Sequence, residues 1–190
     1  MATSVRDFEA SSTDIDGLWV LRPKRVADDR GVISELFRAS AFEAAGLPDP
    51  GPWRQVNLTA THWGGIRGMH GEDMVKLVGV VSGEAFGAYV DCRSDSPTRG
   101  RVVSLPLELG VQVLVPAGVC NGFQALSEEP AQYLYCFTSE WRPDMPGPAV
   151  HPLDPDLGIT WPIEIDPDDV ARLSAKDAQL PPLREVLARR

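Results

Sequence analysis

The sequence predicts an all-β domain, and three observations support this prediction. The central part of the chain is a succession of short runs rich in β-branched and aromatic residues, separated by clusters of glycine, proline, serine and aspartate. Helical patterns occur only on either side of this central part. Neither end of the sequence has the alternation of strands and helices that a parallel sheet requires. We therefore expect a closed barrel or two facing sheets.

The expected elements follow one another in a simple order. An early helical signal predicts a short helix over 39–45. Each following run is short, β-rich and bounded by turn-forming residues, and these expected strands are 77–81, 84–92, 102–107, 111–115, 122–126 and 132–138. Two late helical signals predict further short helices at 167–173 and 183–188.

Length and composition favour one domain, 1–190. A chain of 190 residues with 43% hydrophobic residues can bury one sizeable core but is short for two. No apolar stretch approaches the roughly 20 residues needed to cross a bilayer, and the first residues lack the basic-then-apolar order of a signal peptide. We therefore expect a cytoplasmic protein with no membrane partner. Cys92, Cys120 and Cys136 are odd in number and lack CxxC spacing, which favours reduced thiols that fill the core.

The charge balance restricts the possible partners. The chain carries 18 lysines and arginines against 27 aspartates and glutamates, a formal net charge of −9. Such a surface repels a phosphate backbone, so nucleic acid is not an expected partner. A small polyanion can still bind where a few basic residues gather in one pocket. The basic residues available for such a pocket are Arg30, Arg67, Lys76 and Lys176.

Two short stretches carry the chemistry. The first is the sequence Ile-Arg-Gly-Met-His at 66–70, with Lys76 just downstream, and the second is Tyr-Leu-Tyr-Cys-Phe-Thr at 133–138. Because side chains alternate between the faces of a strand, His70, Lys76 and Tyr135 could converge inside one sheet structure. A base, a cation and a phenol suit proton abstraction beside a ketone, in which the cation stabilises the enolate oxygen.

Seven motifs in order carry a resemblance to a known family. They are Asp-Arg-Gly at 29–31 with Glu-Leu-Phe at 35–37, Gln-Val-Asn at 55–57, RGMH at 67–70, VDCRSDSPTRG at 90–100, VPAGVCNGF at 115–123, LDPDLGITWP at 153–162 and LSAKDAQLP at 173–181. From about Trp19 to Leu183 the chain resembles the nucleotide-sugar 4-keto-hexose 3,5-epimerases, the dTDP-4-dehydrorhamnose 3,5-epimerase family.

The resemblance implies a fold, an assembly and an activity. It narrows the all-β prediction to a cupin-type jelly roll with short peripheral helices, and it implies a homodimer in which an N-terminal strand joins the partner's sheet. The implied activity is cofactor-independent inversion of C3, C5 or both in a nucleoside-diphosphate 4-keto-6-deoxyhexose. The substrate that the resemblance favours is dTDP-4-dehydro-6-deoxy-D-glucose. No nicotinamide cofactor is expected, and the sequence lacks the GxGxxG fingerprint.

The resemblance also assigns site residues. It implies His70 as the base, Tyr135 as the acid on the opposite side of the sugar, Asp177 as the carboxylate paired with His70, and Lys76 as the cation. The implied substrate-binding residues are Arg30, Glu35, Gln55, Asn57, Arg67, Asn121, Trp141 and Lys176. Arg30 is expected to reach across the dimer, and Trp141 to stack on the nucleobase. No metal is expected, because the chain has three histidines and no HxH pair.

Three departures from the family pattern leave the exact activity open. The connection from His70 to Lys76 is shorter and more acidic than the family's, Asn121 stands where a histidine is common, and Ile33 stands where an aromatic often covers the base. The short loop that begins HGE at 70–72, together with VDCR at 90–93 and PAGVCN at 116–121, also resembles the epimerases acting on GDP-linked 4-keto heptoses. A 3,4-ketoisomerase and a non-catalytic sugar-nucleotide-binding cupin are two further candidate functions.

Overall fold

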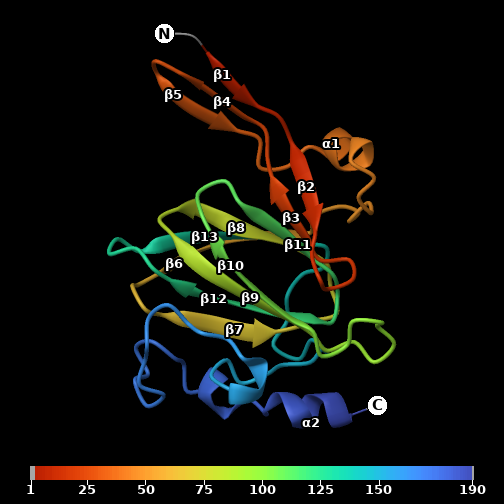
Figure 1. Cartoon of the computed structure of the whole chain (residues 1–190), viewed down its shortest axis with the longest axis vertical. Coiled ribbons are helices and arrows are strands. Elements are labelled where there is room, and N and C mark those ends of the chain that lie inside the picture. The colour runs from red at the N-terminus through yellow and green to blue at the C-terminus, as the bar shows by residue number, and fades with distance from the viewer. Residues whose placement is uncertain (1–2, 190) are drawn as a thin grey trace.

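The computed structural model describes residues 3–189, which form three antiparallel sheets, two short α-helices and two 3₁₀-helices (Figure 1). One sheet has the order β2-β3-β11-β8-β13-β6, and its strands in that order are Glu9–Ser12, Trp19–Arg22, Gln112–Val115, Lys76–Ser82, Ala131–Phe137 and Gln55–Thr61. A second has the order β10-β9-β12-β7, with strands Val102–Leu107, Ala85–Asp91, Val119–Ala125 and Ile66–His70.

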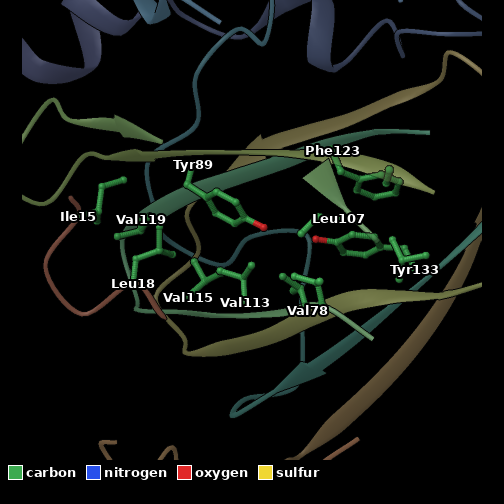
Figure 2. Packing of buried hydrophobic residues seen from close by; sticks show 13 residues of the cluster. Ile15, Leu18, Val78, Tyr89, Leu107, Val113, Val115, Val119, Phe123 and Tyr133 are labelled. Carbon is green, nitrogen blue, oxygen red and sulfur yellow. The ribbon is translucent and has the colours of Figure 1, made fainter. Parts of the chain in front are cut away.

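The six-stranded and four-stranded sheets face each other across the main core. Val78, Val113 and Tyr133 from the first sheet meet Tyr89 and Phe123 from the second, all within one apolar cluster (Figure 2). The Phe123 and Tyr133 rings stack with their centroids 4.0 Å apart. Two antiparallel sheets closed around a common core confirm the predicted jelly roll.

Strand alternation explains which side chains enter the space between the sheets. On β8, Val78 and Val80 belong to the central cluster, whereas Leu77 belongs to a cluster on the other face of the sheet. Lys76 lies two residues before Val78 and therefore on the inner face, where it is only 3% exposed. Tyr135 on β13 packs against the same central cluster. Lys76 and Tyr135 thus lie on the inner faces of β8 and β13, as side-chain alternation predicts.

The outer faces of the two sheets are covered by peripheral segments. Helix α1, Ala39–Ala44, contributes Phe42 to the cluster on the outer face of the six-stranded sheet. Helix α2, Leu183–Ala188, and the 3₁₀-helix η1, Pro155–Leu157, cover the outer face of the four-stranded sheet, as Figure 1 shows at the C-terminal end. Within residues 3–189 no helix is long and apolar enough to cross a membrane.

Most predicted elements are confirmed, and one is wrong. The six predicted strands correspond to β8 to β13, and the helices expected at 39–45 and 183–188 are α1 and α2. The segment 167–173 is a series of turns instead of a helix. The side chains of Asp166 and Asp169 each accept a hydrogen bond from a backbone N–H two residues later. These local bonds give the backbone N–H groups a partner outside a helix and so compete with helix formation. Leu173 then forms a bridge with Ile66.

The third sheet forms an N-terminal arm that the sequence did not predict. Its strand order is β1-β4-β5, with the strands Ser4–Arg6, Arg25–Asp28 and Gly31–Ser34. The arm extends away from the two facing sheets (Figure 1). It leaves three apolar side chains largely exposed, namely Val5, Val32 and Ile33.

Candidate active site

A β-bulge in β7 brings Arg67 and His70 to the same side of the strand. Across from β7, Asn121 of β12 pairs with His70 and Phe123 pairs with Arg67, so Gly68 and Met69 together face one residue of β12. Residues three apart on a regular strand point to opposite faces, but the extra residue of a bulge restores a common face. Arg67 and His70 accordingly line the same cavity.

Gly68 is the residue that makes this bulge possible. Its φ is +120°, a conformation that side chains with a Cβ rarely adopt, and the Gly68–Met69 peptide bond is cis. A Cβ at this position would lie 2.5 Å from the Cα atom of Gly122 and 2.7 Å from the carbonyl oxygen of Asn121. Backbone therefore packs against backbone at the centre of the site.

The cavity beside the bulge has a volume of about 270 Å³ and opens between the two facing sheets. It collects seven of the residues predicted from the sequence, which are Asn57, Arg67, His70, Lys76, Asn121, Tyr135 and Trp141. A neighbouring cavity of about 460 Å³ shares Arg67, Gly68 and His70 with it and is also lined by Lys176 and Asp177. His70 therefore lies where the cavity lined by Lys76 and Tyr135 adjoins the cavity lined by Lys176 and Asp177.

His70 and Asp177 form a hydrogen-bonded pair. The 3₁₀-helix η2, Asp177–Gln179, places the Asp177 carboxylate where it accepts a hydrogen bond of 2.8 Å from His70 Nε2. Burial disfavours the carboxylate, but the hydrogen bond and charge of His70 outweigh it, so the pKa of Asp177 lies below its ordinary value. An ionised carboxylate can only accept, so Nε2 carries the proton and Nδ1 is the basic nitrogen of the neutral ring.

Tyr135 supplies a phenol that stays protonated. It lies on β13, paired with Asn57 of β6, and its side chain lines the same cavity as His70. Burial raises the pKa of Tyr135 well above its ordinary value of 10.0, while the positive charge of Arg67 acts in the opposite direction. At neutral pH this hydroxyl is therefore a proton donor.

The Lys76 ammonium is held by three acceptors. Its Nζ donates to the carbonyl oxygen of His70 at 3.0 Å, to the Asn121 side-chain oxygen at 2.8 Å, and to the Glu72 carboxylate. An ammonium has three N–H donors, so every one of them is engaged. The cation is consequently fixed at the inner end of the cavity, next to His70.

Three of the predicted nucleotide ligands, Gln55, Asn57 and Trp141, are joined by hydrogen bonds near the rim. Gln55 donates to Asn57 at 3.0 Å and accepts a hydrogen bond of 2.7 Å from the backbone N–H of Trp141. The Trp141 side chain is 41% exposed. Arg67 donates from Nε to Thr61 at 2.8 Å.

Arg30 and Glu35 lie on or beside the arm and outside the two cavities that contain His70. Arg30 lies in the turn between β4 and β5 and pairs with Asp28 at 2.7 Å. Glu35 follows β5 and pairs with Arg38. Within a single chain, these two predicted ligands are therefore separate from the group around His70.

The sequence reasoning missed Glu72, Thr59 and Phe137 as cavity residues. Glu72 follows the bulged strand by two residues and precedes the buried Lys76 by four, and the acidity of this short connection was the signal that could have identified it. Phe137 belongs to the stretch 133–138, where the sequence analysis assigns a role only to Tyr135. Its place at the end of β13, two residues after Tyr135, puts it on the cavity side.

Two further findings concern metals and thiols. Across residues 3–189 no group of three or more histidine, cysteine, aspartate or glutamate side chains is arranged to hold a metal ion. Cys92, Cys120 and Cys136 are buried and unbridged, as expected for residues that fill the core.

A base with a fixed tautomer, a protonated phenol and a buried ammonium around one cavity can exchange protons on carbon next to a carbonyl. An all-β jelly roll with such a site defines an acid–base isomerase. Comparison with known proteins identifies the family. The sequence profile of the family described as dTDP-4-dehydrorhamnose 3,5-epimerase matches residues 12–185.

Individual relatives cover most of the chain. It is 35% identical over 175 residues to a dTDP-4-dehydro-6-deoxyglucose 3-epimerase from Streptomyces bikiniensis, covering 89% of this chain and 86% of that protein. It is 36% identical over 177 residues to a dTDP-4-dehydrorhamnose 3,5-epimerase from Streptomyces griseus, covering 90% and 85%.

A solved structure agrees with these relatives. The dTDP-6-deoxy-D-glucose-3,5-epimerase of Legionella pneumophila, in complex with dTDP-4-keto-L-rhamnose, superposes with a TM-score of 0.82 at 34% identity, covering 95% of this chain and 97% of that one. The chain belongs to the dTDP-4-dehydrorhamnose 3,5-epimerase family of carbohydrate isomerases.

Proposed function

We propose that the protein inverts C3, C5 or both of dTDP-4-dehydro-6-deoxy-D-glucose without a cofactor. The observation that carries this proposal is that His70, paired with Asp177, lines the same cavity as Tyr135 and Lys76. The Legionella pneumophila relative is described in complex with a dTDP-linked 4-keto sugar. A sugar of this class carries the C4 ketone that the chemistry needs.

The proposed reaction begins with proton removal beside the ketone. The C4 carbonyl acidifies the protons on C3 and C5, and His70 Nδ1 takes one of them, becoming an imidazolium that the Asp177 carboxylate stabilises. The C–H electron pair forms the enolate, whose negative charge develops on the C4 oxygen. Lys76 stabilises that charge electrostatically.

The proposed second step returns a proton from the other side of the ring. Tyr135 donates its phenolic proton to the enolate carbon, the C4 carbonyl re-forms, and the carbon is inverted. His70 then loses its proton and Tyr135 regains one, so no net proton is consumed. One acid and one base suffice for either carbon, because C3 and C5 both flank the ketone.

The proposed nucleotide contacts lie at the rim of the cavity. Arg67 and Lys176 suit diphosphate oxygens, because cations pair with phosphate through charge-assisted hydrogen bonds. Gln55 and Asn57 can hydrogen-bond to phosphate and sugar. The exposed Trp141 ring offers a face on which a nucleobase can stack.

Calorimetry with dTDP, GDP and UDP tests the choice of base. We expect dTDP to bind best, with affinity that weakens as salt concentration rises. Tighter binding of GDP would assign the protein to the epimerases that act on GDP-linked 4-keto heptoses.

We also propose that the protein is a homodimer in which the arm of one protomer completes the site of the other. Val5, Val32 and Ile33 of the arm are 57%, 51% and 71% exposed, which suits apolar burial against a second copy. Arg30 and Glu35 belong to this arm region and would reach the partner's nucleotide.

Subunit mixing tests the shared site. His70→Ala and Arg30→Ala are each expected to be impaired alone, whereas mixed dimers contain one site with both residues intact. Mixing should therefore restore activity. Mixing His70→Ala with Tyr135→Phe is the matched control, because these two residues belong to the same protomer's site and every mixed site stays defective. If neither mixture regains activity, the proposal of a shared site is contradicted.

Product analysis tests the reaction itself. The protein is incubated in deuterated water with dTDP-4-dehydro-6-deoxy-D-glucose, and NMR follows deuterium at C3 and C5 together with the configuration of each carbon. Inversion with deuterium incorporation is the expected result. Migration of the ketone from C4 to C3 would indicate a 3,4-ketoisomerase, and binding without any exchange would indicate a non-catalytic sugar-nucleotide-binding protein.

A further inference from the structure

Glu72 links the inner end of the cavity to its rim. It lies in the connection between β7 and β8, and its side chain is 18% exposed. One carboxylate oxygen accepts a hydrogen bond from the Lys76 ammonium, and the other accepts one of 3.3 Å from the indole N–H of Trp141. The two donors belong to opposite ends of the site, since Lys76 is buried and Trp141 is at the surface.

Glu72 is a carboxylate under ordinary conditions. Burial disfavours its charge, but the positive charge and hydrogen bond of Lys76 more than compensate, so the pKa of Glu72 is lowered below 4.5. Both oxygens are therefore acceptors, and each faces a donor. A charge-assisted hydrogen bond to an ammonium is stronger than one to a neutral indole, so Lys76 is the more firmly held of the two partners.

The short acidic connection between His70 and Lys76 has a structural role here. It is one of the departures from the family pattern, and it brings an acidic side chain within reach of both Lys76 and Trp141. The backbone of the connection is itself anchored, because the N–H of Gly71 donates to Pro148 at 2.8 Å and that of Asp73 donates to Pro146 at 3.0 Å. Glu72 is thus presented from a fixed backbone.

We propose that Glu72 is a positioning residue that sets the sugar-binding and base-binding ends of the site relative to each other. It fixes Lys76 beside the position of the C4 oxygen and fixes the Trp141 ring against the nucleobase. This inference rests on the proposed function for its effect on turnover. The Glu72–Trp141 contact can be tested without any turnover.

Glutamine is a discriminating replacement for Glu72. Glutamine keeps one oxygen and replaces the other with an amide nitrogen that only donates, so only one of the two donors, which bond to different oxygens of Glu72, keeps its acceptor in place. Lys76 should take that oxygen because of its charge, which leaves the indole N–H of Trp141 facing another donor. Alanine removes both acceptors. Comparing the two variants therefore distinguishes an effect on the nucleobase-binding end, at Trp141, from an effect on the sugar-binding end, at Lys76.

The experiment compares Glu72→Gln, Glu72→Ala and, as the matched control, Asp73→Asn, which removes the same charge from the exposed neighbouring position. We expect Glu72→Gln to weaken dTDP binding about fivefold, as loss of one modest hydrogen bond would. We expect Glu72→Ala to weaken it similarly and to slow deuterium exchange about tenfold as well. Asp73→Asn should match the parent in both measurements.

A second measurement separates positioning from a general structural effect. The indole N–H resonance of Trp141, assigned by its loss in Trp141→Phe, should move in Glu72→Gln and stay in place in Asp73→Asn. In the Trp141→Phe background, Glu72→Gln should cause no further loss of dTDP affinity. An unmoved resonance, or an equal further loss of affinity, would overturn the inference.

Failure of the proposed function would look different. A parent protein that neither binds dTDP nor exchanges protons would contradict the proposed function, while the Trp141 resonance would still report on Glu72. A parent that exchanges protons, with a Glu72→Ala variant that exchanges equally fast, would overturn the role of Glu72 alone.

Discussion

His70 Nε2 lies 2.8 Å from Asp177 Oδ1, although 107 positions of sequence separate the two residues. The contact exists because the segment after Ile165 returns to the edge strand β7, where Leu173 bridges to Ile66 and the backbone N–H of Ile66 donates to Arg172. This contact fixes which nitrogen of His70 is basic, and it therefore sets the direction from which a proton can be removed.

Replacing Asp177 with asparagine should slow proton exchange without unfolding the protein. The variant keeps the size of the side chain but loses the charge that supports the imidazolium, and its amide can turn a donor toward His70. We expect deuterium exchange to slow by about 10²-fold or more, within the range for general acid–base groups. An exchange rate equal to that of the parent would show that Asp177 does not support the base.

Replacing Tyr135 with phenylalanine should separate exchange from inversion. The variant keeps the ring and loses only the hydroxyl, so the fold and removal of the proton by His70 should persist. Return of a proton from the other side should fail, and inversion should slow by about 10²-fold or more. NMR in deuterated water measures both processes in one sample, and inverted product formed at the parent rate would exclude Tyr135 as the acid.

Replacing Gly68 with alanine should damage the site through the backbone. The new Cβ would lie 2.5 Å from the Cα atom of Gly122, and a φ of +120° is strained for alanine. We expect a loss of at least about 1–3 kcal/mol of folding stability from the strain alone, measurable by urea unfolding. Gly158→Ala is a useful control, because its Cβ would meet nothing within 4 Å, although its φ of 62° is also left-handed. Equal losses in the two variants would argue against the close approach of β7 and β12.

Asp91 should make folding stability depend on acid pH. This carboxylate is fully buried and accepts hydrogen bonds from Arg93, Ser96 and Thr98. Burial opposes its ionisation, yet these bonds dominate and lower the pKa of Asp91 from 3.8 to about 2. A pKa that is lower in the folded state stabilises the protein above the unfolded value, and this stabilisation is lost as the pH falls toward 2.

The variant Asp91→Asn tests that dependence. It leaves Arg93 without its buried partner, so we expect a loss of about 3 kcal/mol at pH 7. The difference in unfolding free energy between parent and variant should shrink between about pH 4 and pH 2. Asp95→Asn, at an exposed position of the same loop, is the control. A difference that stays constant with pH would show that the charge of Asp91 contributes nothing.

The sequence predicted the central strands well because their pattern is local. The runs from β8 to β13 are apolar and bounded by turn formers, and alternation alone placed Lys76 and Tyr135 on inner faces. The arm strands are three or four residues long and contain no buried residue, so they lack that pattern. The prediction of a helix at 167–173 was wrong because aspartate side chains accept hydrogen bonds from nearby backbone N–H groups and Leu173 pairs with Ile66 of a distant strand.

Local sequence patterns were not sufficient to predict the site, because its residues come together through long-range contacts. The pairing of His70 with Asp177 followed from family resemblance, since the separation of 107 positions leaves no local signal. The bulge that turns Arg67 toward His70 depends on the register between β7 and β12, which no single strand reveals. Glu72 was visible only as acidity in a short connection. Of its two partners, Lys76 lies only four positions away, but Trp141 lies 69 positions away and reaches Glu72 only in the folded chain.

The central claim is that His70 removes a proton beside the C4 ketone, and one measurement tests it most directly. The parent and His70→Asn are incubated with dTDP-4-dehydro-6-deoxy-D-glucose in deuterated water, while calorimetry confirms that both bind dTDP. We predict deuterium at C3, C5 or both with the parent, and exchange slower by about 10²–10⁴-fold with the variant. Exchange by His70→Asn at close to the parent rate would contradict the account.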